Sequence, residues 1–194
     1  MKYLITSFFL FYGYAIVRYH FGKGLDQTFF FFVVNKAIAW SATFYLGMSV
    51  LLLPKKFPSK KQFGLSSFAL GIIHIILTLY LAILNYYPDF YNKGQISVLG
   101  FSVLMSGLLS ISLMTMAFLA SLFSSKFPKV WLHYGFFAFL VNSCHPIIIG
   151  IQNWFSPLLW PMFLPPITLL ASLLSGIIFY LRWKQKKGEK NFLP

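Results

Sequence analysis

The side chains best able to do chemistry in this sequence are four histidines, His20, His74, His133 and His145. Their surroundings are strongly apolar, and the last two share the stretch WLHYGFFAFLVNSCHP. A neutral imidazole coordinates a metal without bringing net charge into lipid, which makes it the natural intramembrane ligand for haem iron. The same ring can also join two helices by a hydrogen bond, so residue type alone leaves both roles open.

The remaining reactive groups exclude several kinds of site. Cys144 is the single cysteine, which rules out an internal disulfide and any metal site built on two cysteines. The acidic residues, Asp26, Asp89 and Glu189, all fall in expected loops or in the tail. No expected span therefore carries the carboxylate that a proton pump or cation carrier usually needs, and no carboxylate pair is available for acid and base catalysis.

Composition determines which elements must position the histidines. The chain is 58% hydrophobic, contains 24 Phe and is only 10% charged, which is too much apolar surface for one water-soluble globule of 194 residues. Apolar runs of roughly 18 or more residues are long enough to cross a bilayer as helices. We therefore expect an all-α integral membrane protein whose single domain, residues 1–194, is a bundle of six transmembrane helices. The expected spans are residues 3–21, 28–53, 64–87, 95–123, 128–150 and 165–183.

The basic residues predict the orientation of this bundle. The formal net charge is +13, and with a cytoplasmic amino terminus twelve of the sixteen basic residues lie on the inner side. This asymmetry follows the positive-inside rule, so both termini are expected in the cytoplasm. Lys55, Lys56, Lys60 and Lys61 are interpreted as topology determinants. We expect contact with membrane lipid, no nucleic-acid binding, and a multi-pass location in a bacterial inner (plasma) membrane.

Helical rise predicts how deep each imidazole lies. At about 1.5 Å per residue, His133 is about 9 Å from the inner boundary, His74 about 16 Å, and His145 and His20 about 27 Å. The two histidines of the fifth span are thus about 18 Å apart along the axis, which predicts two levels. They also differ by about 120° around a regular helix. A kink or local rewinding near Asn142, one turn before Pro146, would bring them to one face.

Residues 151–164, IQNWFSPLLWPMFL, separate the fifth and sixth spans and contain two prolines and two tryptophans. Indole rings settle at membrane surfaces, so the segment is interpreted as a cover over one end of the bundle. The alternative is a kinked extension of the sixth helix.

Lys36, preceded by Asn35, is the one charge that lies well away from both ends of an expected span. A buried ammonium seeks an anion or another acceptor, which would make it a partner for a haem propionate or a quinone oxygen. The alternative is that its long side chain reaches the outer interface.

Two segments resemble known haem proteins. KKQFGLSSFALGIIH, residues 60–74, resembles the part of ferric reductase-like transmembrane proteins in which two basic residues and a Leu-Gly-Leu-like turn precede a helix with a haem histidine. WLHYGFFAFLVNSCH, residues 131–145, resembles the later helix of that family, in which Trp, Leu and His precede a second histidine. The nearest form is the short bacterial haem-binding membrane subunit of methionine sulfoxide reductase systems.

The resemblance implies that His74, His133 and His145 are haem ligands and that the cofactor is haem b, in one or two copies. It also implies electron transfer across the membrane to or from a partner redox protein, either an exported oxidoreductase or a cytoplasmic flavoprotein. Quinone or FMN would be the electron source. The chain departs from the family at Lys60 and Lys61, where arginines are usual, at Phe63 in place of Leu, and in a histidine spacing one residue shorter.

Two functions follow. The first is a cytochrome b-like electron-transfer subunit, which depends on a partner because the chain has no nucleotide-binding motif. The alternative is a non-redox six-helix membrane protein, such as a small transporter or an assembly factor, whose histidines join helices.

Overall fold

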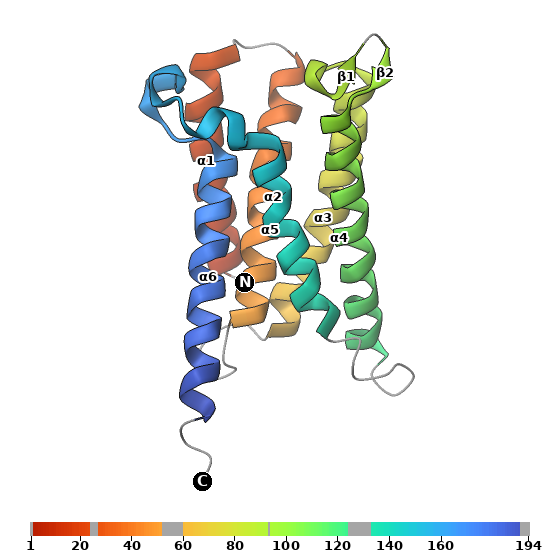
Figure 1. The fold of residues 1–194 in the computed structure, drawn as a ribbon, viewed down its shortest axis with the longest axis vertical. Helices are drawn as coiled ribbons and strands as arrows, with labels where there is room; N and C mark the ends of the chain where they lie inside the picture. The colour runs from red at the N-terminus through yellow and green to blue at the C-terminus, as the bar shows by residue number, and fades with distance from the viewer. Residues whose placement is uncertain (1, 24–26, 52–59, 93, 124–132, 191–194) are drawn as a thin grey trace.

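The computed structural model describes residues 2–23, 27–51, 60–92, 94–123 and 133–190. Within these residues the chain is helical apart from short connecting elements (Figure 1). The long helices are α1 (Lys2–Lys23), α2 (Gln27–Leu51), α3 (Lys60–Ile83), α4 (Val98–Leu122), α5 (Tyr134–Trp154) and α6 (Ile167–Lys190). The short elements are η1 (Pro88–Phe90), β1 (Tyr91–Asn92), β2 (Gln95–Ile96), η3 (Pro157–Leu159) and η4 (Pro161–Phe163).

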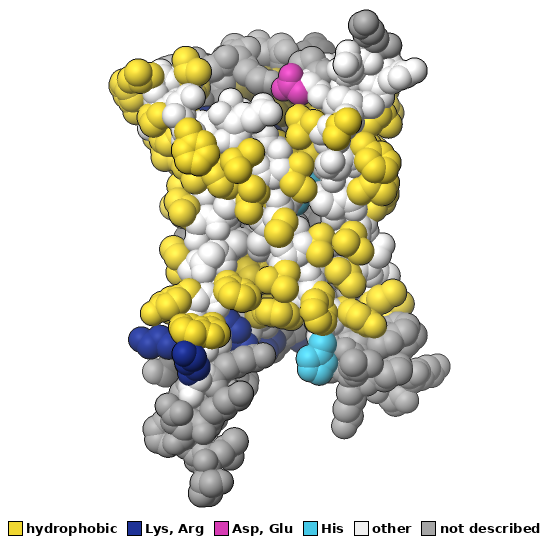
Figure 2. Space-filling view, viewed as in Figure 1, with side chains coloured by type: hydrophobic (Ala, Val, Ile, Leu, Met, Phe, Trp, Pro, Cys, Tyr) yellow, Lys and Arg dark blue, Asp and Glu magenta, His cyan; other side chains and the backbone are white. Residues whose placement is uncertain are grey.

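In the described part of the chain, five helices, α2 to α6, are long and apolar enough to cross a membrane. This confirms an all-helical chain with several candidate membrane spans. The first expected span also forms a helix, α1, but α1 is not among these five. Large apolar side chains cover the outside of the bundle, as Figure 2 shows, and this is the surface that lipid would contact.

Two helix boundaries differ from the expected ones for local reasons. Helix α3 ends at Ile83, four residues before the expected end, because Asn85 adopts a left-handed backbone conformation with φ of 54°. Helix α4 begins at Val98 because Ser97 caps it, accepting a hydrogen bond from the Gly100 amide at 3.0 Å. The short antiparallel hairpin of β1 and β2 occupies the residues between η1 and this cap.

Helix α6 continues to Lys190, seven residues past its expected end at position 183. Glu189, expected in a tail, therefore belongs to the last turn of α6. The expected start of the fifth span, residues 128–132, lies outside the described residues.

Helix α2 is the centre of the bundle. It packs most closely on α3 and also contacts α1, α5 and α6, while α4 packs mainly on α5. Gly47 makes this packing possible, since a Cβ atom there would lie 2.5 Å from Ile178 Cδ1 and 2.9 Å from Phe139 Cε2. One core cluster surrounds Trp40 and Val33, and a second surrounds Phe139 and Leu46.

The segment between α5 and α6 forms the two 3-10 turns η3 and η4 at one end of the bundle (Figure 1). Two side chains of α1 bind the end of this segment that leads into α6. Arg18 Nη1 donates to the Leu164 carbonyl, and the Tyr14 hydroxyl donates to the Pro165 carbonyl at 2.7 Å. Met162 and Phe163 have positive φ angles of 50° and 57°, a backbone conformation that residues other than glycine rarely adopt. The segment is therefore held in place from α1 and does not continue α6 as a helix.

Candidate functional site

His74 is held by the neighbouring helix. Its Nδ1 lies 2.7 Å from Oδ1 of Asn35 on α2, a residue with only 1% of its surface exposed. The amide nitrogen of Asn35 donates to the Thr78 and Tyr87 hydroxyls at 3.0 and 3.1 Å, which assigns the carbonyl oxygen to His74. Because that oxygen can only accept, Nδ1 carries the proton. In the neutral ring, Nε2 is then left with a lone pair.

His145 has the same arrangement on a different pair of helices. Its Nδ1 lies 2.8 Å from the Ser106 hydroxyl on α4. The Ser106 hydroxyl donates its own hydrogen to the Val103 carbonyl at 2.9 Å. It must therefore accept from His145, so the Nε2 of this neutral imidazole also has a lone pair.

The structure brings these two imidazoles into one neighbourhood. His74 and His145 are both half-buried, lie within electrostatic range of each other, and are each within range of the Lys36 ammonium. The depths expected from the sequence, about 16 Å for His74 and about 27 Å for His145, place the two rings on different levels. One reason for the difference is that α3 begins at Lys60, four residues earlier than expected, which sets His74 about 21 Å along its helix.

His133 does not join this pair. It is exposed at the start of α5, while His145 is about 18 Å further along the axis. Helix α5 remains α-helical through Asn142 and Pro146, and the Asn142 amide donates to the Thr43 hydroxyl on α2 at 2.8 Å. The rewinding expected near Asn142 is therefore not seen. His20 is likewise exposed, near the end of α1.

Lys36 lies beside this pair of imidazoles. Its Nζ is 5.2 Å from the centre of the Phe32 ring and 5.7 Å from that of Tyr87, both within the range of cation–π contacts. Tyr87 in turn accepts a hydrogen bond from Asn35, which holds His74. Sequence reasoning noted Lys36 and Asn35 but missed Ser106, because serines are frequent throughout the spans.

The residues present fit a haem better than a bare metal ion. No group of three or more His, Cys, Asp or Glu side chains among the described residues could hold a metal ion. A porphyrin supplies four nitrogen ligands itself and requires only one or two axial ligands from the protein. Metal-binding histidines almost always donate their second ring N–H to a neighbouring acceptor, as His74 and His145 do.

Small residues accompany both rings. A Cβ atom on Gly107 would lie 3.9 Å from His145 Cε1, and Gly71 stands about one turn before His74 on α3. An added Cβ atom at Gly71 would lie 3.6 Å from Ile111 Cδ1 on α4, so this position already contacts a neighbouring helix.

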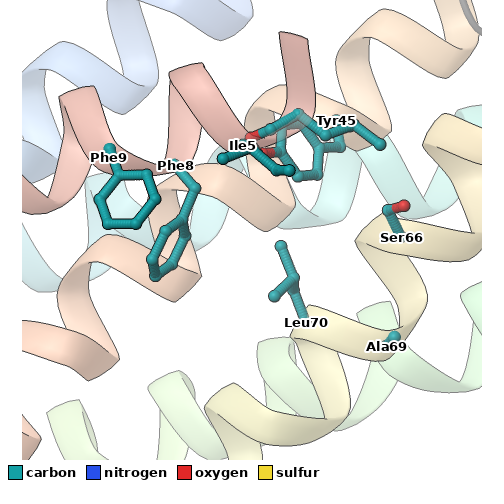
Figure 3. Close-up of a pocket in the computed structure, with 8 residues that line it drawn as sticks. Ile5, Phe8, Phe9, Tyr45, Ser66, Ala69 and Leu70 are labelled. Atoms are coloured by element: carbon teal, nitrogen blue, oxygen red, sulfur yellow. Dashed lines mark hydrogen bonds between the residues drawn. The ribbon is translucent and has the colours of Figure 1, made fainter. Parts of the chain in front are cut away.

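A separate groove opens between α1, α2 and α3 (Figure 3). It has a volume of about 330 Å³, and Phe8, Phe9 and Leu70 are among its apolar lining residues. Tyr45 is its only titratable lining residue, and the Tyr45 hydroxyl donates to the Leu4 carbonyl of α1. With no imidazole in its lining, this groove does not belong to the site of His74 and His145.

A comparison with protein-family models finds no match, and no curated protein matches the chain. Fold and site together define an all-helical protein with five helices able to cross a membrane and a pair of neighbouring imidazoles among them. The likeness to ferric reductase-like proteins stays an expectation from residues 60–74 and 131–145.

Proposed function

We propose that this chain is a haem b-binding membrane electron-transfer subunit in which His74 and His145 would hold one haem. The observation that carries the proposal is the matched state of the two rings, each with Nδ1 bonded to a neighbouring helix and Nε2 left as the coordinating atom. His133, at the exposed start of α5, is not part of this ligand set.

A haem held by both imidazoles would supply one-electron transfer, in preference to binding of oxygen or substrate at the iron. The protein supplies position and electronic tuning. Asn35 and Ser106 fix the tautomer and direction of each ring and increase its basicity by accepting the Nδ1 proton.

Electrons must come from and go to partners, because the sequence carries no nucleotide-binding motif. The proposed partner is a redox protein, either an exported oxidoreductase or a cytoplasmic flavoprotein, with quinone or FMN as the electron source. The distribution of lysines supports six spans with cytoplasmic termini in a bacterial inner membrane. Lys60 is the first residue of α3 and Lys184 lies in the last two turns of α6, and α3 begins and α6 ends at the same end of the bundle (Figure 1).

The alternative function is a non-redox membrane protein with structural histidines. The observation that favours it is that both imidazole hydrogen bonds connect adjacent helices, His74 joining α3 to α2 and His145 joining α5 to α4. In that case the protein would fold fully without a prosthetic group.

Purification from haem-replete cells separates the two functions. We expect a reducible b-type absorption spectrum that is lost in His74→Gly and His145→Gly and is restored to these variants by free imidazole. His133→Gly and His20→Gly are matched controls at exposed positions and should keep the spectrum. Folded, colourless wild-type protein would support the non-redox alternative and overturn the proposal.

A further inference from the structure

The lysine beside the imidazole pair has a position that suits recognition of an acid. Lys36 follows Asn35 on α2, and its ammonium is within electrostatic range of both imidazoles. A porphyrin held by the two rings would therefore lie within electrostatic range of this cation.

From this position we infer that Lys36 binds a carboxylate side chain of the porphyrin and so orients the haem with its acidic edge toward the end of the bundle where α2 begins. The inference rests on the proposed function and adds to it the anchoring residue and the direction of the cofactor.

The charge inventory supports an anion supplied by a ligand. Neither residues 27–83 nor residues 98–188 contain an aspartate or glutamate. Helices α2, α3, α4 and α5 thus offer no carboxylate of their own at the level of Lys36. A cation within a membrane span is costly, and the cost is reduced when an anion neutralises it. The two carboxylates of haem b would also be costly as charges in a membrane span. An ion pair between Lys36 and one of them would reduce the cost of both charges.

Tyr87 provides a second donor at the same place. Its ring is 5.7 Å from Lys36 Nζ, and its hydroxyl accepts a hydrogen bond from the Asn35 amide, which leaves the phenolic hydrogen available to donate. Burial raises the pKa of Tyr87 to about 12, so the hydroxyl is a proton donor at all physiological pH values. Lys36 and Tyr87 together can therefore hold one carboxylate by two hydrogen bonds.

This arrangement connects the carboxylate site at Lys36 to His74. Tyr87 contacts Asn35, and Asn35 contacts His74, so a carboxylate at Lys36 is connected to one ligand through two hydrogen bonds. A positive charge near the haem also stabilises its reduced form, which carries one positive charge less. Removing the charge should lower the reduction potential.

The test compares haem with its dimethyl ester, which lacks both carboxylates. Apo-protein from haem-depleted cells is titrated with each compound. We expect the wild type to bind the free acid at least about tenfold more tightly than the ester, the equivalent of one charge-assisted hydrogen bond. Lys36→Gln should lose this preference and show a lower reduction potential. Lys36→Arg should retain the preference, and Lys61→Gln, a matched lysine exposed at the start of α3, should be unchanged.

The outcomes of this titration are distinguishable. Equal preference for acid over ester in the wild type and in Lys36→Gln overturns the role of Lys36, although histidine ligation would stand. A wild type that binds neither compound in a His74-dependent way overturns the proposed function itself, and this inference with it.

Discussion

Oδ1 of Asn35 and Nδ1 of His74 lie 2.7 Å apart and connect the two most closely packed helices of the bundle. Three polar groups of α3 and of the residues just after it converge on this one buried amide, since Thr78 and Tyr87 accept its two hydrogens. Asn35 therefore determines both the packing of α2 on α3 and the tautomer of His74.

Replacing this amide should be costly. We expect Asn35→Leu to lower the free energy of unfolding by about 1–3 kcal/mol, because it leaves the His74 N–H without an acceptor inside the bundle. Thermal unfolding in detergent measures the effect, and Asn92→Leu, at an exposed position of β1, is the control. Equal melting temperatures for the two variants would contradict this account of α2 and α3.

The second imidazole offers a matched test on a different helix pair. Ser106→Ala removes the acceptor for His145 Nδ1, and loss of such a contact typically costs about 10–100-fold in affinity for a bound metal. We expect weaker haem retention and a higher reduction potential, since the ring becomes less basic. Ser112→Ala is the control, because that hydroxyl is exposed and only donates to the Leu108 carbonyl. A haem content in Ser106→Ala equal to that of the control would exclude His145 as a ligand oriented by α4.

Close packing at Gly47 can be tested without any cofactor. Gly47→Ala would place a methyl group 2.5 Å from Ile178 Cδ1, so we expect a loss of about 1–3 kcal/mol through overpacking. Gly176→Ala, where nothing lies within 4 Å, should be neutral or slightly stabilising. Ile178→Val removes the obstructing atom and should restore part of the loss when combined with Gly47→Ala. Failure of the double variant to recover would mean that the Phe139 contact at 2.9 Å dominates.

Alkaline pH should weaken the packing around Tyr87. Its folded pKa is about 12 and its ordinary value is 10.0, so its contribution to stability is complete below pH 10 and is lost as the pH rises toward 12. We therefore expect the wild type to lose stability between pH 10 and 12 more steeply than Tyr87→Phe does. Melting curves across this interval check the sign, and parallel curves for the two proteins would contradict burial of the phenol.

Much of the fold could be predicted because helices in lipid are specified by long apolar runs, and α2 to α6 follow such runs. Boundaries were predicted less well, because they depend on local conformations such as the left-handed Asn85 and the cap at Ser97. Both act through backbone geometry that hydropathy does not report.

The site was predicted in part. His74 and His145 lie within electrostatic range of each other, whereas His133 lies at the exposed start of α5, about 18 Å from His145 along the helix axis. Asn35 was visible as an amide beside Lys36, the one charge far from the ends of an expected span. Nothing distinguished Ser106 from the other serines of α4 before the fold showed its contact with His145.

Each of the two imidazoles is secured within its own pair of consecutive helices, His74 by α2 and α3 and His145 by α4 and α5. On the proposed function, the chain would complete one half of the haem site before it synthesises the other. During synthesis, the residues that hold His74 would be complete once Tyr87 had left the ribosome. His145 would follow about sixty residues later. Docking of one hairpin against the other would be the moment at which both ligands first face each other, so maturation of the centre would be a late step of biogenesis.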